Sequence, residues 1–315
     1  MPRIILDTDP GIDDALAIFL AIASPEIQLE AITTVSGNVP VEQTTRNALA
    51  LLELAGSPDI PVARGSARPL VRRPVDAAYV HGHNGLGDVE LPAPKIKPVA
   101  QHAVDLIIAR VMAAPGEITL VAIGPLTNLA LAVRTEPRIA QRVREVVIMG
   151  GALRVPGNTT PAAEFNIYAD PQAASIVLHA GWPTRLVSLD VTNITCLQRE
   201  QVNLLALSNS KVTKFIQRML DYYFDVFGPV YGVSAFQMHD PLALAASFQP
   251  DLITWENSFV DVELNGTLTL GETVGYFHRP NAPAPNTRVS VSVDSKQFIN
   301  LFMKRIEAYY YKGKS

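Results

Sequence analysis

Short apolar runs, each ending in a polar or glycine-rich cluster, recur through the first two thirds of the chain. Several are followed by residues with the apolar spacing of a helix. Strands that alternate with helices build a mostly parallel sheet covered on both faces, so the pattern predicts an open α/β fold. The runs with their clusters are Arg3–Leu6 before Asp7–Asp14, Leu29–Val35 before Ser36–Asn38, Ile118–Ile123 before Gly124–Asn128, Val146–Met149 before Gly150-Gly151, and Arg185–Leu189 before Asp190.

Every one of these polar clusters follows the carboxyl end of a predicted strand. Ligands of open parallel sheets bind beyond these strand ends, which meet at one edge. Taken singly, each cluster could equally be a turn, because Gly, Asn, Asp and Pro dominate turns. Taken together, they predict a shared crevice formed by Asp7–Asp14, Asn38, the residues near Ile123, those after Met149, and Asp190.

The later part of the chain is less regular. We expect helices over residues 199–227, strands between residues 258 and 293 that form a small antiparallel extension, and a last helix over Ser295–Tyr309 that Asp294 or Ser295 caps. Residues 68–98 and 225–238 are expected to be mobile loops, here called the first and second flaps. With no internal repeat and no Ser/Gly linker, residues 1–315 are predicted to form a single domain.

The composition excludes several classes of protein. The longest apolar run, Ala15–Ala23, is too short to cross a bilayer, and no apolar signal segment precedes Asp7. Cys196 is the only cysteine, so the chain cannot form an internal disulfide. A net charge of −4 without a basic run argues against nucleic-acid binding. These features predict a cytoplasmic protein with neither membrane nor nucleic-acid partners.

Four aspartates crowd into the first cluster, at positions 7, 9, 13 and 14. Close carboxylates repel, so a cation must neutralise them or some must stay protonated. A helix beginning near Asp13 contributes only partial positive charge, whereas a hard dication that prefers oxygen ligands would balance the cluster. An EF-hand is excluded because Ile12 and Ile18 stand where that loop needs glycine and glutamate. A metal with free carboxylates beside it suits hydrolysis of a neutral, hydroxyl-rich molecule.

The motif DTDPGIDDALA at residues 7–17 resembles the N-terminal signature of the inosine-uridine preferring nucleoside hydrolases. The resemblance extends in the same order over roughly residues 1 to 300. It continues through TTVSGN (33–38), AIGPLTNLA (122–130), VIMGG (147–151), EFNIYADPQAA (164–174) and FQMHDPLA (236–243). It implies the Rossmann-like fold of that family and the Ca²⁺-dependent hydrolysis of ribonucleosides such as uridine or inosine to ribose and free base.

The resemblance also implies the ligands of the metal. Asp9, Asp14 and Asp240 would bind Ca²⁺, together with the backbone carbonyl of Ile123, and Asp9 would in addition be the general base. Oxygen ligands of this kind are those that Ca²⁺ prefers. Asp7 would lie outside the direct ligands and orient the loop.

For the ribose, the resemblance implies a set of polar contacts around an apolar floor. Asp13 and Asn38 would bind the 2′-hydroxyl side, and Asn158, Glu164 and Asn166 the 3′- and 5′-hydroxyl region. The substrate hydroxyls would reach the metal beside Asp240. Met149 would lie beneath the sugar. As a residue at a strand end, Met149 could instead be core, and Asn158, in Pro156-Gly157-Asn158, could be an ordinary turn residue.

The pair His239-Asp240 resembles the subgroup of the family that protonates the leaving base, which makes His239 the expected acid. His81 aligns with a histidine near the base pocket, whereas His83 receives no role. Phe227 and Tyr231 of the second flap would pack on the base or belong to the core. The resemblance further implies a homodimer or homotetramer, and it leaves the preference between purine and pyrimidine open.

Two other functions remain possible at this stage. A phosphatase of the haloacid dehalogenase type also carries two aspartates after its first strand, as Asp7 and Asp9 do here, but Gly11 stands where it needs threonine or valine. Such an enzyme would use Mg²⁺ and cleave p-nitrophenyl phosphate. The second is a protein that binds nucleosides with Ca²⁺ but does not turn them over, and an assay on uridine distinguishes it from an enzyme.

Overall fold

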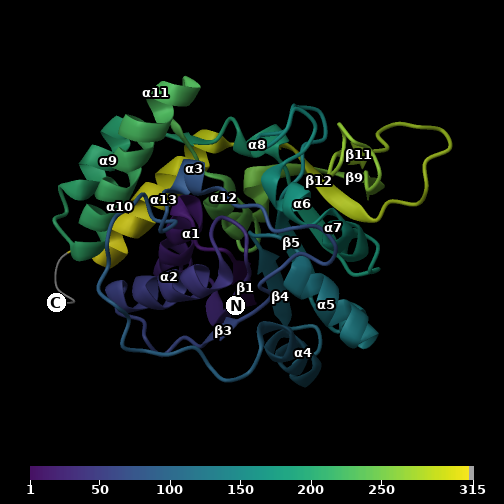
Figure 1. Cartoon of the computed structure of the whole chain (residues 1–315), viewed down its shortest axis with the longest axis horizontal. Coiled ribbons are helices and arrows are strands. Elements are labelled where there is room, and N and C mark those ends of the chain that lie inside the picture. Colours follow the sequence, from purple (N-terminus) through teal and green to yellow (C-terminus); the bar gives the residue numbers. More distant parts are fainter. Residues whose placement is uncertain (312–315) are drawn as a thin grey trace.

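The structure is a computed structural model, which describes residues 1–311. One eight-stranded sheet runs through its centre (Figure 1), and every neighbouring pair is parallel except the last. In sheet order the strands are β3 (Val62–Arg64), β2 (Gln28–Thr34), β1 (Arg3–Thr8), β4 (Ile118–Ala122), β5 (Glu145–Met149), β6 (Thr184–Val187), β12 (Thr287–Val293) and β9 (Ile253–Ser258).

Two hydrophobic cores flank this sheet, because successive side chains of a strand face opposite sides. In β1, Ile4 and Leu6 join one core while Ile5 joins the other. The helices of the first core are α1 (Ile12–Ala23), α2 (Val41–Leu54), α9 (Arg199–Ala206), α10 (Lys211–Tyr222), α12 (His239–Ala246) and α13 (Ser295–Tyr310). Those of the second are α4 (Ala103–Ala113), α5 (Thr127–Thr135), α7 (Pro171–Leu178) and the 3-10 turn η1 (Pro137–Gln141).

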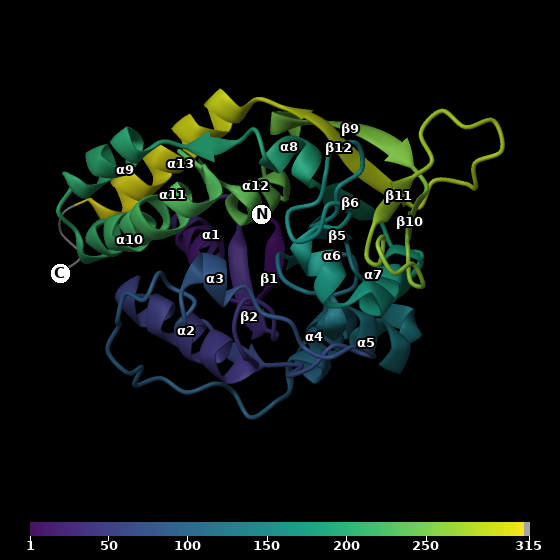
Figure 2. The ribbon, with the colours of Figure 1, turned by 45° about the horizontal axis from the view of Figure 1, so that its top comes forward.

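Helix α1 is buried along nearly its whole length, as its composition predicts. Eleven of its twelve residues are buried, including Asp13 and Asp14. A helix that is apolar on every side belongs inside the protein, and α1 lies among the sheet, α12 and α13 (Figure 2). Its first turn therefore carries two carboxyl groups into the interior.

The remaining elements are short. The helical ones are α3 (Ala78–His81), α6 (Phe165–Ala169), α8 (Leu189–Thr192), the π-helical turn η2 (Tyr223–Phe227), α11 (Gly228–Tyr231) and η3 (Pro250–Leu252). Two small antiparallel sheets pair β10 (Val260–Val262) with β11 (Thr273–Gly275), and β7 (Cys196–Leu197) with β8 (Phe236–Gln237). The predicted fold class is thus confirmed, and β10–β11 is the antiparallel extension.

Two details differ from the sequence prediction. The last expected strand, β12, joins the main sheet, where it is parallel to β6 and antiparallel to β9. The flaps also contain regular structure, namely α3 in the first flap and α11 with β8 in the second.

The expected cap of the last helix is confirmed. Asp294 caps α13, and its side chain accepts a hydrogen bond from the Gln297 N–H at 2.9 Å.

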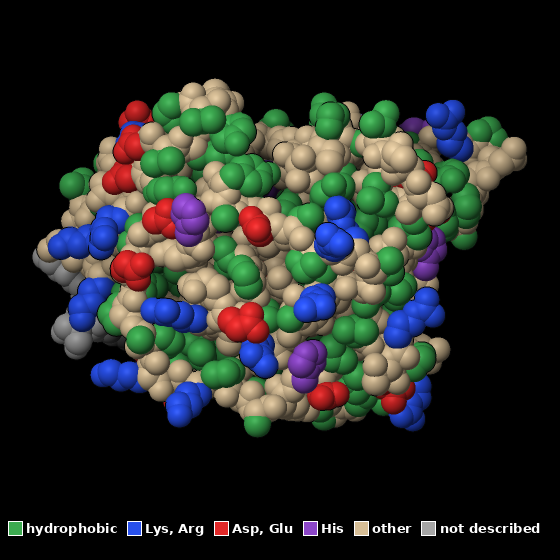
Figure 3. Space-filling model, in the orientation of Figure 1, with side chains coloured by type: hydrophobic (Ala, Val, Ile, Leu, Met, Phe, Trp, Pro, Cys, Tyr) green, Lys and Arg blue, Asp and Glu red, His purple; other side chains and the backbone are tan. Residues whose placement is uncertain are grey.

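No helix within residues 1–311 is both long and apolar enough to cross a membrane. On the face shown in Figure 3, basic side chains are scattered among acidic and apolar ones.

Candidate active site

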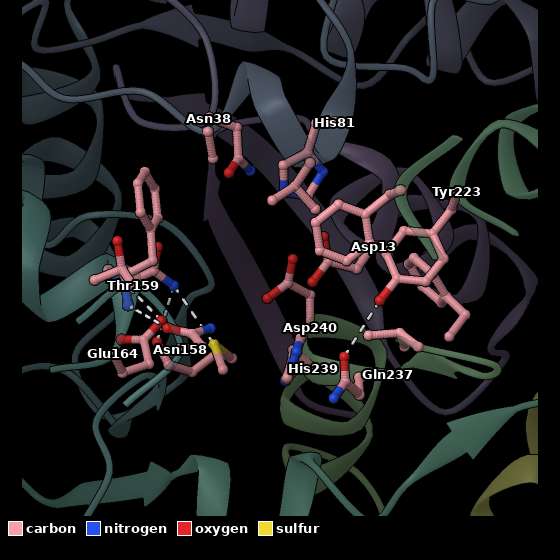
Figure 4. Close-up of a pocket in the computed structure, with 18 of the residues that line it drawn as sticks. Asp13, Asn38, His81, Asn158, Thr159, Glu164, Tyr223, Gln237, His239 and Asp240 are labelled. Atoms are coloured by element: carbon pink, nitrogen blue, oxygen red, sulfur yellow. Dashed lines mark hydrogen bonds between the residues drawn. The ribbon is translucent and has the colours of Figure 1, made fainter. Parts of the chain in front are cut away.

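A cavity of about 270 Å³ lies above the carboxyl ends of the central strands, between the two flaps (Figure 4). This is the crevice expected where the order of the sheet reverses at β1 and β4. Ten of the residues predicted for the site line it. They are Asp13, Asn38, His81, Ile123, Met149, Asn158, Glu164, Asn166, His239 and Asp240. Asp9 and Asp14, the other two, lie beside it and are fully buried.

The turn from β1 into α1 is built around the carboxylate of Asp14. One oxygen accepts hydrogen bonds from the Gly11 N–H at 2.9 Å and the Asn38 side-chain amide at 3.1 Å. The other accepts from the hydroxyl of Thr8 and from the Asp9 N–H. Gly11 is required here because a Cβ at this position would lie 2.6 Å from the Asn38 amide nitrogen. The turn thereby brings the cluster to the cavity floor.

Asp9 has one satisfied and one unsatisfied oxygen. Its Oδ2 accepts from the Asn38 backbone N–H at 2.7 Å, whereas Oδ1 is buried without a hydrogen-bond partner among residues 1–311. Two glycines, Gly37 and Gly124, cradle this carboxylate so closely that a Cβ on either would overlap it. Because unpaired buried oxygens are costly, Asp9 is a strong candidate for a ligand-binding group.

Asp240 enters the cluster from the start of α12, far along the chain. Carboxylate oxygens of Asp13, Asp14 and Asp240 lie within 4.8 Å of one another. Carboxylates this close repel one another, so the three groups titrate together rather than independently. Burial, and then the nearby charge of Asp14, raise the pKa of Asp13 to about 7. Burial and the neighbouring charges also raise the pKa values of Asp9 and Asp240, and burial raises that of Asp14.

Asp7 lies beneath this cluster rather than in it. Its Oδ1 accepts from the Thr33 hydroxyl at 2.5 Å and the Asn128 amide at 2.8 Å. Asn128 also binds the carbonyl of Thr34 and the N–H of Ser66. Asp7 thus ties β1 to its neighbours and supports the loop, which is the role expected for it.

One side of the cavity, here called the polar wall, consists of Asn158, Glu164 and Asn166. Glu164 caps α6 and accepts hydrogen bonds from the N–H groups of Gly151, Asn166 and Ile167 at 2.9–3.2 Å. The Asn166 amide donates to the Ile123 carbonyl at 3.0 Å, and the Asn158 oxygen accepts from the Phe165 N–H at 2.9 Å. Each side chain is therefore held in place by the backbone before any ligand binds.

The opposite side, here called the aromatic wall, consists of Tyr79, Tyr223, Phe227, Tyr231 and Phe236. The rings of Phe227 and Tyr231 stack at a centroid distance of 4.3 Å, and Tyr223 contacts both Phe227 and Phe236 at under 5 Å. Tyr79 reaches across from the first flap, 6.2 Å from Tyr231. Both tyrosines at the mouth are about half exposed.

Two histidines face the cavity between the walls. The Nδ1 of His239 lies 2.7 Å from the hydroxyl of Thr192, and burial lowers the pKa of His239 to about 4. The Nδ1 of His81 accepts from the Ile12 N–H at 3.0 Å, which places its proton on Nε2. Burial, and then the nearness of His239, lower the pKa of His81 to about 3. Both imidazoles are neutral at neutral pH in the free protein.

Other residues are placed differently from the sequence prediction. Asp190 is not in the crevice, because its carboxylate accepts from the N–H groups of Leu153 and Arg154 and holds that loop. His83, which received no role from the sequence, agrees with that expectation, because it lies outside the cavity and is almost fully exposed, 3.5 Å from Asp88. Sequence reasoning missed Tyr79, Tyr223, Phe236 and Gln237 of the lining and Thr192 behind His239.

The chain as a whole is similar to a known family. The sequence model of the inosine-uridine preferring nucleoside hydrolases matches residues 4–300. The chain belongs to this family. An inosine-uridine preferring nucleoside hydrolase of Crithidia fasciculata is 43% identical over 310 residues, which are 98% of either chain. A pyrimidine-specific ribonucleoside hydrolase of Salmonella gallinarum is 38% identical, over 97% of this chain and 98% of the relative.

A solved structure of a relative has the same fold. The purine-preferring ribonucleoside hydrolase from Gardnerella vaginalis superposes with a TM-score of 0.93 at 37% identity, covering 98% of this chain and 99% of that one. Family membership therefore accounts for the arrangement of the sheet. The names of these relatives indicate different base preferences.

Proposed function

We propose that the protein hydrolyses the N-glycosidic bond of ribonucleosides, releasing ribose and a free base. The observation that carries the proposal is the division of one cavity between a polar wall and an aromatic wall, with the aspartate cluster and His239 between them. A ribonucleoside has the same division, because a hydroxyl-rich sugar is joined to a flat, apolar-faced base. The names of its relatives support the same reaction class.

We further propose that the cluster binds Ca²⁺ through Asp9, Asp14, Asp240 and the Ile123 carbonyl. The fit rests on the unpartnered buried Oδ1 of Asp9 and on the absence of any Lys or Arg from the described lining of the cavity. The donor set is oxygen only, as Ca²⁺ prefers. When bound, the ion would neutralise the clustered carboxylates and make a water molecule easier to deprotonate.

The protein's own residues then have separate tasks. Asp9 would also be the base that takes a proton from the attacking water. Asp13 faces the cavity beside Asn38 and would accept a hydrogen bond from the 2′-hydroxyl. The polar wall would hold the remaining hydroxyls, with Met149 beneath the ring. Fixing the sugar in this way lowers the entropy cost of reaching the transition state.

His239 is the proposed proton donor to the leaving base. It lines the cavity, and its Nδ1 is occupied by the Thr192 hydroxyl, so Nε2 is the nitrogen available to a substrate. Because the imidazole is neutral in the free protein, proton donation requires the pKa of His239 to rise when a substrate binds. His81 would contact the base or the 5′ side through its Nε2–H.

The phosphatase alternative does not account for the chain, because the family match covers nearly all of it and the cavity is lined by carboxylates that repel phosphate. The binding-protein alternative fails if the protein turns over its ligand. A cytoplasmic location and a homodimer or homotetramer stay predictions.

The deciding experiment is a panel of inosine, uridine, cytidine and adenosine, incubated with the purified Ca²⁺-loaded protein. Release of free base, measured chromatographically, and of an equal amount of reducing sugar is the expected result. Binding without release of either product would favour the binding protein.

A further inference from the structure

Thr192 lies directly behind His239, and none of the motifs in the sequence includes it. It is the last residue of α8, the short helix that follows β6, and it is fully buried. Its hydroxyl oxygen lies 2.7 Å from the Nδ1 of His239, which lines the cavity (Figure 4). Within residues 1–311 this hydroxyl makes no other hydrogen bond. The only polar contact of the side chain is therefore with the histidine at the site.

A second buried threonine in the same segment, Thr195, behaves differently. Its hydroxyl donates to the carbonyl of Val191, four residues earlier, at 2.9 Å, and lies 3.1 Å from the hydroxyl of Ser295. A bond to the carbonyl four residues back is a common choice for threonine in a helical turn. The Thr192 hydroxyl does not bind the corresponding carbonyl of Ser188, which accepts from the Thr192 N–H. It contacts a side chain of α12 instead.

The surroundings of the Thr192 hydroxyl decide which of the two atoms donates. If the Nδ1 of His239 were the donor, the hydroxyl proton would be buried without an acceptor, and unpaired buried donors are costly. If the hydroxyl donates to Nδ1, its proton is paired, and the proton of the neutral imidazole lies on Nε2. His81 is held in the same way, because its Nδ1 accepts from the Ile12 N–H at 3.0 Å. Both histidines therefore carry their proton on Nε2.

We propose that Thr192 is a positioning residue, which holds the ring of His239 in one orientation and in the tautomer that presents Nε2–H to the leaving base. The inference rests on the proposed function and adds a residue that acts through another. Thr192 is not among the residues that line the cavity, so its effect on a substrate passes through His239. A hydroxyl is both donor and acceptor, so the same contact can hold the ring whether Nδ1 is free or protonated.

Substitution of Thr192 should slow only the reactions that need His239. Thr192→Val keeps the shape of the side chain and removes the hydroxyl, so kcat on uridine should fall by roughly ten- to hundredfold while KM stays within about twofold. Hydrolysis of p-nitrophenyl riboside, whose leaving group needs no proton, should stay within about twofold of wild type. Thr192→Ser restores the hydroxyl and should recover most of the loss on uridine.

Two controls separate positioning from a purely structural role. Thr195→Val removes a buried hydroxyl of the same segment that does not contact His239, so it should keep the wild-type ratio of the rates on uridine and p-nitrophenyl riboside. In a His239→Ala background, Thr192→Val should cause no further loss on uridine, because both substitutions remove the same interaction. Circular dichroism and metal analysis check the fold and the Ca²⁺ occupancy of each variant.

The tautomer can also be measured without turnover, by ¹⁵N NMR of the histidine-labelled protein at pH 8. The signal of His239, assigned by its absence from His239→Ala, should be that of Nε2–H, and Thr192→Val should show a larger share of Nδ1–H. An Nδ1–H tautomer in the wild type would overturn the role of Thr192. So would equal losses on the two substrates in Thr192→Val, no loss on uridine, or a further loss in the His239→Ala background.

The outcomes separate this inference from the proposed function. Failure of the wild-type protein to release base from any riboside would overturn nucleoside hydrolysis itself. The NMR measurement does not depend on turnover, so it would still decide whether Thr192 sets the tautomer of His239.

Discussion

The two walls of the cavity are held in place by different forces. On the polar wall, Glu164 is fixed by three backbone N–H groups, and Asn166 by the carbonyl of Ile123. On the aromatic wall, ring contacts join side chains from both flaps, and Tyr79 and Tyr231 remain half exposed. The first wall is set by directional hydrogen bonds and the second by less directional stacking.

This difference corresponds to what each wall would bind. Ribose is common to all ribonucleosides, so a rigid arrangement of hydroxyl partners suits every substrate. Bases vary in size and in their polar edges, and stacked rings can accept several of them. We therefore expect changes to the polar side and the metal cluster to affect all ribosides alike, whereas changes to the base side should depend on the leaving group.

The largest effect should come from removing one hydroxyl of the sugar. Asp13 and Asn38 would lose their partner in 2′-deoxyuridine, and a site built to bind a hydroxyl rejects the analogue that lacks it by roughly 10⁴-fold. Steady-state kcat/KM for uridine and 2′-deoxyuridine measures this directly. Similar values for the two would show that the polar groups do not read the 2′-hydroxyl.

The next largest effect should come from removing one carboxylate of the aspartate cluster that lies beneath both walls. Asp14→Ala should abolish Ca²⁺ binding and lower kcat/KM on every riboside by roughly 10³-fold, because several kcal/mol of charge stabilisation are lost. Metal analysis and circular dichroism of the purified variant check occupancy and fold. Asp59→Ala, an exposed aspartate outside the site, is the control. Full Ca²⁺ occupancy in Asp14→Ala would rule out its assignment as a ligand.

His239→Ala should separate the leaving groups. If His239 gives a proton to the base, its loss slows uridine or inosine hydrolysis by roughly 10²-fold or more, which is in the usual range for general acid catalysis. Hydrolysis of p-nitrophenyl riboside should slow far less, since that leaving group needs no proton. Equal losses on both substrates, together with lower Ca²⁺ occupancy, would instead mean that His239 only supports Asp240.

The smallest effect is on stability. Burial raises the pKa of Asp7 to about 7, and burial with the charge of Asp14 raises that of Asp13 to about 7, whereas aspartate in an unfolded chain titrates near 4. Between these values the folded protein holds more protons than the unfolded one, so the free energy of unfolding falls as pH rises.

The melting temperature of the metal-free protein should therefore be lower at pH 8 than at pH 5. In the proposed metal site, bound Ca²⁺ would replace protons in the cluster, so it should raise the melting temperature more at pH 8. Thermal unfolding in chelator and in Ca²⁺ at the two pH values tests this. A metal-free protein that becomes more stable toward pH 8 would contradict the charge assignment.

The sequence predicted the polar side of the site better than the aromatic side for a physical reason. Asp13 and Asn38 follow the ends of predicted strands, where polar residues in an apolar chain are conspicuous, whereas Glu164 was assigned by the resemblance to the family. Tyr223 instead ends a helix whose apolar spacing is typical of core packing, and only the tertiary arrangement turns it toward the cavity. Gln237 belongs to the motif FQMHDPLA, but nothing in the sequence shows which way its side chain points.

The strands of the sheet were also predicted unevenly from the sequence. The parallel strands β1, β4 and β5 were readable because each is a continuous apolar run before a polar cluster. β9, with the sequence ITWENS, was missed because it is an edge strand with several exposed or half-exposed residues. Asp190 looked like the other strand-end residues, yet it satisfies backbone N–H groups of a neighbouring loop.

In the proposed reaction, the cavity directs water, and not phosphate, to the anomeric carbon of a ribonucleoside. Turnover of uridine in ¹⁸O-labelled water, followed by mass spectrometry of both products, tests it most directly. We expect one labelled oxygen in the ribose, none in the uracil, and a rate that does not depend on added phosphate. Formation of ribose 1-phosphate, or a requirement for phosphate, would contradict it.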